Sequence, residues 1–355
     1  MMLRGAGAAA TRSSPAPTMR PMDANVDDRR GTMFWLRRAL LAAGAIAAAV
    51  MLWNLDVHAV GRAIAHVGWG LLFLLAIEIV PEMLFTTGWR FAFTRETSKS
   101  YGTGELLKLW VTGEGVNYLV PSATIAGEVT RVAMLNDSHP ADVRAGAVVV
   151  ARLAGSVGQI GFLLAGFALI LPGLPMMQAH GWIAPTAAAL LLLLALGVTL
   201  YAVAGWRWIS SPVPNNSDAT RRRLLRAVPN HVRGYFAAHP VRFVCSAIAC
   251  LSAYAWGGVE AFFICRFIGV PVSMFTAMAI EVLSVTIDGI LFLVPAKVGT
   301  QELGKTAIFS MLGLPLSSGF AFGVVRHIRE LSWALSGFVI YTTAGGGRQQ
   351  AAAGR

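Results

Sequence analysis

Two stretches of this chain, 174 residues apart, repeat the same pattern of apolar and charged residues. Residues 109–152 align without a gap on residues 283–326, where LWVTGEGVNYLVPSATIAGEVTRVA pairs with LSVTIDGILFLVPAKVGTQELGKTA. Twelve of the 44 aligned positions are identical. Chance matches between apolar segments do not preserve acids and bases, so the chain contains a duplicated unit. The charged columns are Glu114 with Asp288, Glu128 with Glu302, Arg131 with Lys305, and Arg152 with Arg326.

The composition is that of an all-α protein that crosses the membrane several times. The 355 residues are 55% hydrophobic and 13% charged, whereas ordinary globular domains carry about 25% charge. Residues 185–204 form an apolar run long enough to span a bilayer core, which takes about 20 residues. The net charge of +11 is carried by loops without interleaved aromatic residues. Nucleic acid is therefore not an expected partner.

The hydropathy pattern predicts six spans and two broken segments. The spans are residues 34–55, 69–91, 143–171, 183–206, 243–268 and 318–341. The broken segments, 105–134 and 275–312, contain Gly115, Pro121, Gly289 and Pro295, which interrupt helices. The domain organisation that follows is a disordered tail at 1–33, a first half at 34–171, a second half at 172–342 with a basic loop at 207–242, and a tail at 343–355. A cleaved signal peptide is the alternative for the first apolar run.

Loop charge predicts the topology. Arginine and lysine gather before the first span, after the second and fourth, and after the last, while residues 172–181 and 269–273 carry no charge. Basic loops lie on the cytoplasmic side, so both termini are expected there. The alternation holds only if each broken segment returns to the side that it entered from, by re-entering or by crossing twice. The second half is then inverted relative to the first, and the broken segments should meet around a polar cavity near the midplane.

The matched charges are the candidate site residues. Glu128 and Arg131 lie three residues apart in apolar surroundings, as do Glu302 and Lys305, and ionisable residues inside a membrane are usually functional. These four predict a substrate-binding cavity, with a salt bridge that locks the two halves as the alternative.

Arg152 and Arg326 should face that cavity from opposite sides. Their planar guanidinium groups suit a phosphate or carboxylate, unless the side chains only reach toward the lipid headgroups. Glu114 and Asp288 precede the breaks and are candidates for carrying protons, with a position at headgroup level as the alternative.

Other polar features have weaker patterns. Glu78, Glu82 and Glu260 are acids in apolar runs without a repeat partner, Pro81 is expected to kink its helix, and His327 is interpreted as a hydrogen-bonded filler. The basic run Arg221–Arg226 predicts contact with anionic lipid, or is a plain topology signal. No phosphate-binding loop, nucleophile elbow or metal motif occurs, so neither an enzyme nor a metal or other cofactor is expected.

The segments NYLVPSATIAGEVTRVAML and ARLAGSVGQI resemble the membrane region of lysylphosphatidylglycerol synthases and the wider flippase-like family. Within that family, LVPAKVGTQELGKTAIFSMLGLP followed by VVRHIRELSW looks most like the hopanoid-biosynthesis-associated membrane proteins. The likeness covers about residues 35–342. It implies a bacterial inner-membrane protein that moves a lipid between leaflets, with Glu128, Arg131, Arg152, Glu302 and Arg326 as cavity residues.

The expected function is therefore lipid translocation, of a hopanoid or a polar lipid. One alternative is an integral-membrane enzyme that acts on lipid headgroups. Another is a scaffold that carries no cargo and holds lipid-biosynthesis enzymes together, and such enzymes are possible partners in either case.

Overall fold

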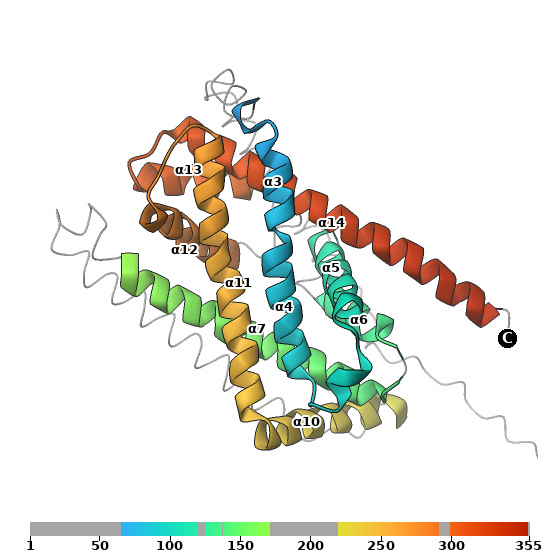
Figure 1. Ribbon diagram of the computed structural model, residues 1–355. Coiled ribbons are helices and arrows are strands. Elements are labelled where there is room, and N and C mark those ends of the chain that lie inside the picture. Colours follow the sequence, from blue (N-terminus) through green and yellow to red (C-terminus); the bar gives the residue numbers. More distant parts are fainter. Residues whose placement is uncertain (1–64, 120–124, 137, 171–218, 291–298, 354–355) are drawn as a thin grey trace, which may run out of the picture.

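The computed structural model describes residues 65–119, 125–136, 138–170, 219–290 and 299–353. Every regular element within these ranges is a helix (Figure 1), which confirms the all-α class. The elements are α3 Gly70–Ile77, α4 Ile79–Ala92, the 3-10 helix η1 Thr97–Ser100, α5 Thr103–Leu119, α6 Ile125–Met134, α7 Ala141–Ile170, α10 Ala219–Ala238, α11 Pro240–Phe267, α12 Met274–Ile290, α13 Thr300–Met311 and α14 Leu316–Ala353.

Three of the predicted spans are confirmed as helices long and apolar enough to cross a membrane. They are Gly70–Ala92, Ala141–Ile170 and Pro240–Phe267. The span predicted at 318–341 falls on α14, which is helical but carries several charges at its centre, and α14 continues to Ala353 through most of the predicted tail. The spans predicted at 34–55 and 183–206, and the tail at 1–33, lie outside the described residues.

A proline interrupts the first apolar helix, as the sequence predicts. α3 ends at Ile77 and α4 begins at Ile79, with Glu78 between them. Pro81 has no N–H to donate to the carbonyl of Ile77 four residues earlier, and its ring crowds that turn. The interruption is confined to Glu78, whose backbone keeps helical angles and whose side chain contacts Arg329 in the charged interior described below.

The first broken segment is a hairpin of two antiparallel helices. Near its closed end, the Gly127 N–H at the start of α6 donates to Asn117 Oδ1 at the end of α5 (2.7 Å). At its open end, Asn136 Nδ2, just after α6, donates to Glu105 Oε1 in the first turn of α5 (3.2 Å). The chain therefore returns to the side that it entered from. With ten residues, α6 is only about 15 Å long, half of the roughly 30 Å bilayer core, which favours a re-entrant hairpin.

The second broken segment is built in the same way from α12 and α13. Ile280 on α12 packs with Ile308 and Phe309 on α13 in one buried cluster, while Asp288 near the end of α12 meets Lys305 on α13. The twelve residues of α13 make a helix of about 18 Å, again too short to cross.

The two halves are related by inversion. α13 and α14 begin 175 residues after α6 and α7, and α11 ends 175 residues after α4. Figure 1 shows α3–α4 (blue) and α11 (orange) side by side, with the hairpins on opposite sides of this pair. Arg242 at the start of α11 donates to the carbonyl of Phe93 at the end of α4 (2.9 Å), so the two helices are antiparallel. Each hairpin also packs on the long helix of the other half: α5 on α14, and α12 on α7.

Glycines let these long helices approach closely. A Cβ placed on Gly158 of α7 would lie 2.7 Å from the carbonyl oxygen of Ala247 and 2.8 Å from the amide nitrogen of Leu251, both in the backbone of α11. Gly155, one turn earlier on α7, has no such neighbour within 4 Å. Small residues at helix crossings are typical of membrane proteins, where close packing drives association.

These two glycines give a matched pair of substitutions with opposite expected signs. Gly158→Ala should destabilise the protein by about 1–3 kcal/mol, because the methyl group meets backbone that cannot move without shifting a helix. Gly155→Ala should stabilise it by up to about 1 kcal/mol through helix propensity. Unfolding by SDS titration in mixed micelles measures both. Equal effects of the two substitutions would show that the α7–α11 contact is not tight.

The basic segment predicted as a loop at 207–242 contains a docked helix instead. α10 packs under the ends of α4 and α7, with Val232 and Tyr235 buried in the same cluster as Trp89 and Phe93. The Tyr235 hydroxyl donates to the carbonyl of Phe91 (2.7 Å). The sequence prediction treated this segment as a loop because basic residues dominate it, but its apolar residues fall on one helical face.

Large apolar side chains remain exposed on the outer faces of the long helices. Phe73 on α3, Leu164 on α7, Ile248 on α11 and Leu335 on α14 are each more than a third exposed. Such residues on long apolar helices are suited to lipid contact. Of the charged residues that the repeat predicts, Arg131, Glu302, Lys305 and Arg326 are buried instead.

Candidate functional site

The first hairpin buries an arginine at its centre. Arg131 on α6 is 2% exposed, and its Nη2 lies 2.6 Å from Glu114 Oε1 on α5. Its Nη1 lies 3.1 Å from Glu128 Oε1, one turn earlier on α6. Nη2 also donates to the carbonyl of Trp110 (3.2 Å), and the guanidinium group lies 3.8 Å from the centre of the Trp110 ring. Two carboxylates, a carbonyl and an aromatic face therefore hold Arg131 inside the hairpin.

The second hairpin contains the corresponding ion pair. Lys305 on α13 is fully buried, and its Nζ lies 3.2 Å from Asp288 Oδ1 on α12. The aligned charge columns thus form the same contact in both halves. Each pair joins the two arms of one hairpin, so it fixes a hairpin and does not lock one half to the other.

Arg152 and Arg326, which align in the repeat, have different ion-pair partners. Arg152 lies beside Glu128, with Nη1 and Oε1 3.9 Å apart. Arg326 instead directs both terminal nitrogens at Glu281 on α12, with Nη2 2.9 Å from Oε1, and its Nε lies 3.4 Å from Glu330. The reason is that position 107, which aligns with Glu281, is a leucine in the first half.

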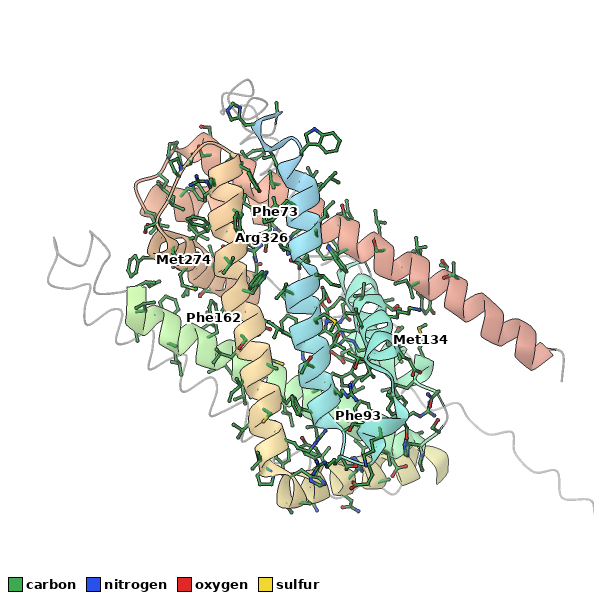
Figure 2. All side chains as sticks on the ribbon, in the orientation of Figure 1. Phe73, Phe93, Met134, Phe162, Met274 and Arg326 are labelled. Carbon is green, nitrogen blue, oxygen red and sulfur yellow. The ribbon has the colours of Figure 1, made fainter. Side chains whose placement is uncertain are left out.

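The two arginines also differ in exposure. The side chain of Arg152 is 52% exposed, whereas that of Arg326 is 9% exposed. Figure 2 shows Arg326 in the interior between α3 and α11. Arg152 is therefore the more accessible of the two for a bound headgroup.

Glu302 has a different partner from its repeat mate. Glu128 contacts two arginines, but Glu302 Oε1 lies 2.7 Å from Nδ1 of His327 on α14. The His327 ring in turn lies edge-on to Tyr118 of α5, with ring centres 6.4 Å apart. His327 thus has the hydrogen-bonded position that the sequence suggested, and it brings Glu302 next to the first half.

One arginine connects three helical elements of both halves. Arg329 on α14 contacts Glu78 between α3 and α4, Glu260 on α11 and Glu330. Its Nε lies 2.7 Å from Glu260 Oε1, and both side chains are at most 5% exposed. The acids at 78 and 260, which lacked a repeat partner in the sequence, meet here on a shared cation.

Sequence reasoning missed Arg329 and Glu281 as interior residues. The available signal for Glu281 was a single acid in the apolar run AMAIEVLSV. Such a residue is costly in a membrane without a partner, and the RHIRE segment, which begins 45 residues later, could have supplied one. Comparing the two repeats marks only positions that are charged in both halves, so an acid present in one half alone is not identified.

Of the four residues expected to break helices, the structure describes the two glycines and not the two prolines. Gly115 does not break its helix, because α5 continues to Leu119, and a Cβ at this glycine would meet the α14 backbone near Ala334 and Phe338. Gly289 is the next-to-last residue of α12. Pro121 and Pro295 lie outside the described residues, in the gaps between the arms of the hairpins.

Comparison with models of known protein families shows which family this chain belongs to. The family model described as the lysylphosphatidylglycerol synthase TM region matches residues 37–337. The chain belongs to this family. Neither the curated proteins nor the solved structures gave a match. The resemblance found in the sequence is thus confirmed for the lysylphosphatidylglycerol synthase membrane region, and the closer likeness to hopanoid-associated proteins stays a prediction.

Membership of the lysylphosphatidylglycerol synthase TM region family, together with the long apolar helices, makes this a membrane protein with a lipid-related function. Its interior offers two kinds of chemistry. The half-exposed Arg152 beside Glu128 presents a guanidinium group suited to a charged headgroup, and His327 places an imidazole beside Glu302.

Proposed function

We propose that this protein moves a polar lipid between the leaflets of a bacterial inner membrane without changing the lipid chemically. The observation that carries the proposal is the pair of inverted hairpins, each with an ion pair on a buried cation and each packed on the long helix of the other half. In inverted-repeat transporters, broken helices from the two halves form the binding site, and rocking of one half against the other exposes it to each side in turn.

The headgroup site that we propose is centred on Arg152. Its side chain is half-exposed and its guanidinium group lies beside Glu128, so a phosphate can approach while the carboxylate orients the arginine. Arg326 is engaged by Glu281 and is buried, which favours a structural role for it. A polar lipid such as phosphatidylglycerol uses these charges, whereas a hopanoid hydrocarbon does not.

The orientation we propose has both termini and α10 on the cytoplasmic side. Basic residues dominate the loops on that side, and α10 packs there against the start of α7 and the end of α4. The run Arg221–Arg226 begins α10 and would contact anionic lipid at the membrane surface. Cysteine labelling at position 222 from the periplasm alone would contradict this orientation.

Substitutions at Arg152 test the headgroup site. Arg152→Lys should slow movement of fluorescent phosphatidylglycerol in proteoliposomes at least about tenfold, because an ammonium group loses the bidentate contact with phosphate. Arg152→Gln should slow it further. Dithionite quenching of the outer leaflet measures the rate, and mass spectrometry of the same lipids checks that no new species forms.

The outcomes separate the rival functions. An Arg152→Gln protein that transports at the full rate removes this residue from the headgroup site. Wild-type protein that moves no lipid in the purified system contradicts transport and favours a scaffold. A chemically altered lipid favours an enzyme.

A further inference from the structure

We infer that Glu302 and His327 form a proton-binding site that couples proton movement to lipid transport. This inference rests on the proposed function and adds its source of energy. It starts from a break in the symmetry of the molecule. In the first half, the position that aligns with His327 is Leu153, and Glu128 is held by Arg131 and Arg152. In the second half, a titratable imidazole contacts the aligned carboxylate.

The geometry of the pair suits a proton site. Glu302 is 8% exposed, and one of its oxygens lies 2.7 Å from His327 Nδ1. Its other oxygen, Oε2, is buried and has no hydrogen-bond partner among the described residues. An unsatisfied buried carboxylate oxygen is costly, and a proton or a water molecule relieves that cost. Histidine is the side chain whose ordinary pKa lies closest to physiological pH.

The earlier proton candidates are less suitable. Glu114 lies 2.6 Å from Arg131, and Asp288 lies 3.2 Å from Lys305. Each of these carboxylates already has a basic side chain as its partner within its own hairpin. The Glu302 contact is with an imidazole, which can be neutral or charged.

The Glu302–His327 pair titrates in the electrostatic field of other charged and titratable residues. These lie on the helices that pack around it. On α14 itself, Arg326 is bound to Glu281 of α12 and to Glu330, and Arg329 is bound to Glu260 of α11 and to Glu78. Neighbouring helices also carry Lys305 on α13 with Asp288 on α12, Tyr118 and Glu114 on α5, and Glu82 on α4.

Proton uptake changes a contact between the halves. In the neutral imidazole, the proton on Nδ1 is shared with Glu302, and uptake forms a second N–H bond at Nε2, giving an imidazolium–carboxylate pair. The proton is taken from water on one side and released to water on the other, so charge and atoms balance. Because the His327 ring lies against Tyr118 on α5, the change acts where the second half meets the first hairpin.

Two measurements on the full-length protein test the site and the coupling separately. In nanodiscs, the 15N signals of His327, assigned by their loss in His327→Gln, should titrate between about pH 5 and pH 8. Their midpoint should move in Glu302→Gln and stay in place in Glu128→Gln, the matched substitution at the repeat position. A His327 signal that does not titrate, or a midpoint that Glu302→Gln leaves in place, overturns the inference.

The coupling is measured with fluorescent phosphatidylglycerol in proteoliposomes that carry a pH gradient. For one proton per lipid, the steady-state ratio between leaflets should change about tenfold per pH unit. In Glu302→Gln and His327→Gln, the ratio should no longer follow the gradient. Wild-type protein that equilibrates lipid without regard to the gradient overturns the coupling but leaves the proposed function standing. Absence of any lipid movement overturns both.

Discussion

Replacing Arg329 with methionine is expected to destabilise the protein by about 3–5 kcal/mol. Methionine keeps most of the side-chain volume but removes the cation that Glu78 and Glu260 share. Two carboxylates, at most 14% exposed, are then left close together without a positive charge between them. The free energy of unfolding, measured by SDS titration in mixed micelles, reports the loss.

Two further variants check the cause of this effect. Arg266→Met removes an exposed arginine from α11 and should change stability by no more than about 0.5 kcal/mol. Adding Glu260→Gln to Arg329→Met should restore part of the lost stability, because a neutral amide replaces one of the stranded charges. If the double variant is as unstable as the sum of the two single variants, Arg329 does not act through Glu260.

Replacing Arg131 with methionine should cost about 3 kcal/mol, toward the lower end of the same range. The effect is smaller because Glu114 is 49% exposed and can turn away from the hairpin once its partner is removed. Glu128 is 20% exposed, so it is the carboxylate that loses more when the cation is removed. The substitution also removes the contact of the guanidinium group with the Trp110 ring. The same unfolding measurement gives the magnitude.

Arg152→Met is the matched control within this cluster. Arg152 contacts the same Glu128, but its side chain is half-exposed and its Nη1 lies 3.9 Å from Oε1 of Glu128. Loss of the Arg152 side chain should therefore change the free energy of unfolding by no more than about 1 kcal/mol. A double-mutant cycle between Arg131→Met and Glu114→Gln then isolates the energy of the contact that joins α5 to α6. A coupling energy close to zero would mean that packing alone holds the hairpin together.

Much of the architecture was predictable from the sequence because it depends on local pattern and on duplication. The length of the apolar runs gave the helices at 70–92, 141–170 and 240–267. Loop charge and the 174-residue repeat gave the inversion, which the antiparallel α4 and α11 confirm. The aligned columns also marked the four residues that form the ion pairs of the two hairpins. The pairing itself, Glu114 with Arg131 and Asp288 with Lys305, was not predicted, because helical spacing favoured Glu128 and Glu302 as the partners.

Other parts of the fold could not be predicted from the sequence pattern. α10 was hidden because its basic residues outweigh its apolar face in a hydropathy window. α14 was expected to end near Tyr341 but continues to Ala353. The break expected at Gly115 is a site of close packing on α14, because a glycine in an apolar run has the same appearance whether it bends a helix or admits a neighbour.

The sequence by itself determined the membrane class, the duplication and the charged residues that the two halves share. Only the tertiary structure decided which acid meets which base: Arg326 pairs with Glu281, 45 residues away, and Arg329 pairs with Glu78, 251 residues away. Helical periodicity predicts contacts three or four residues apart and nothing beyond them. Longer contacts depend on how whole helices pack, and here one extra acid on α12 draws Arg326 away and leaves Glu302 to a histidine.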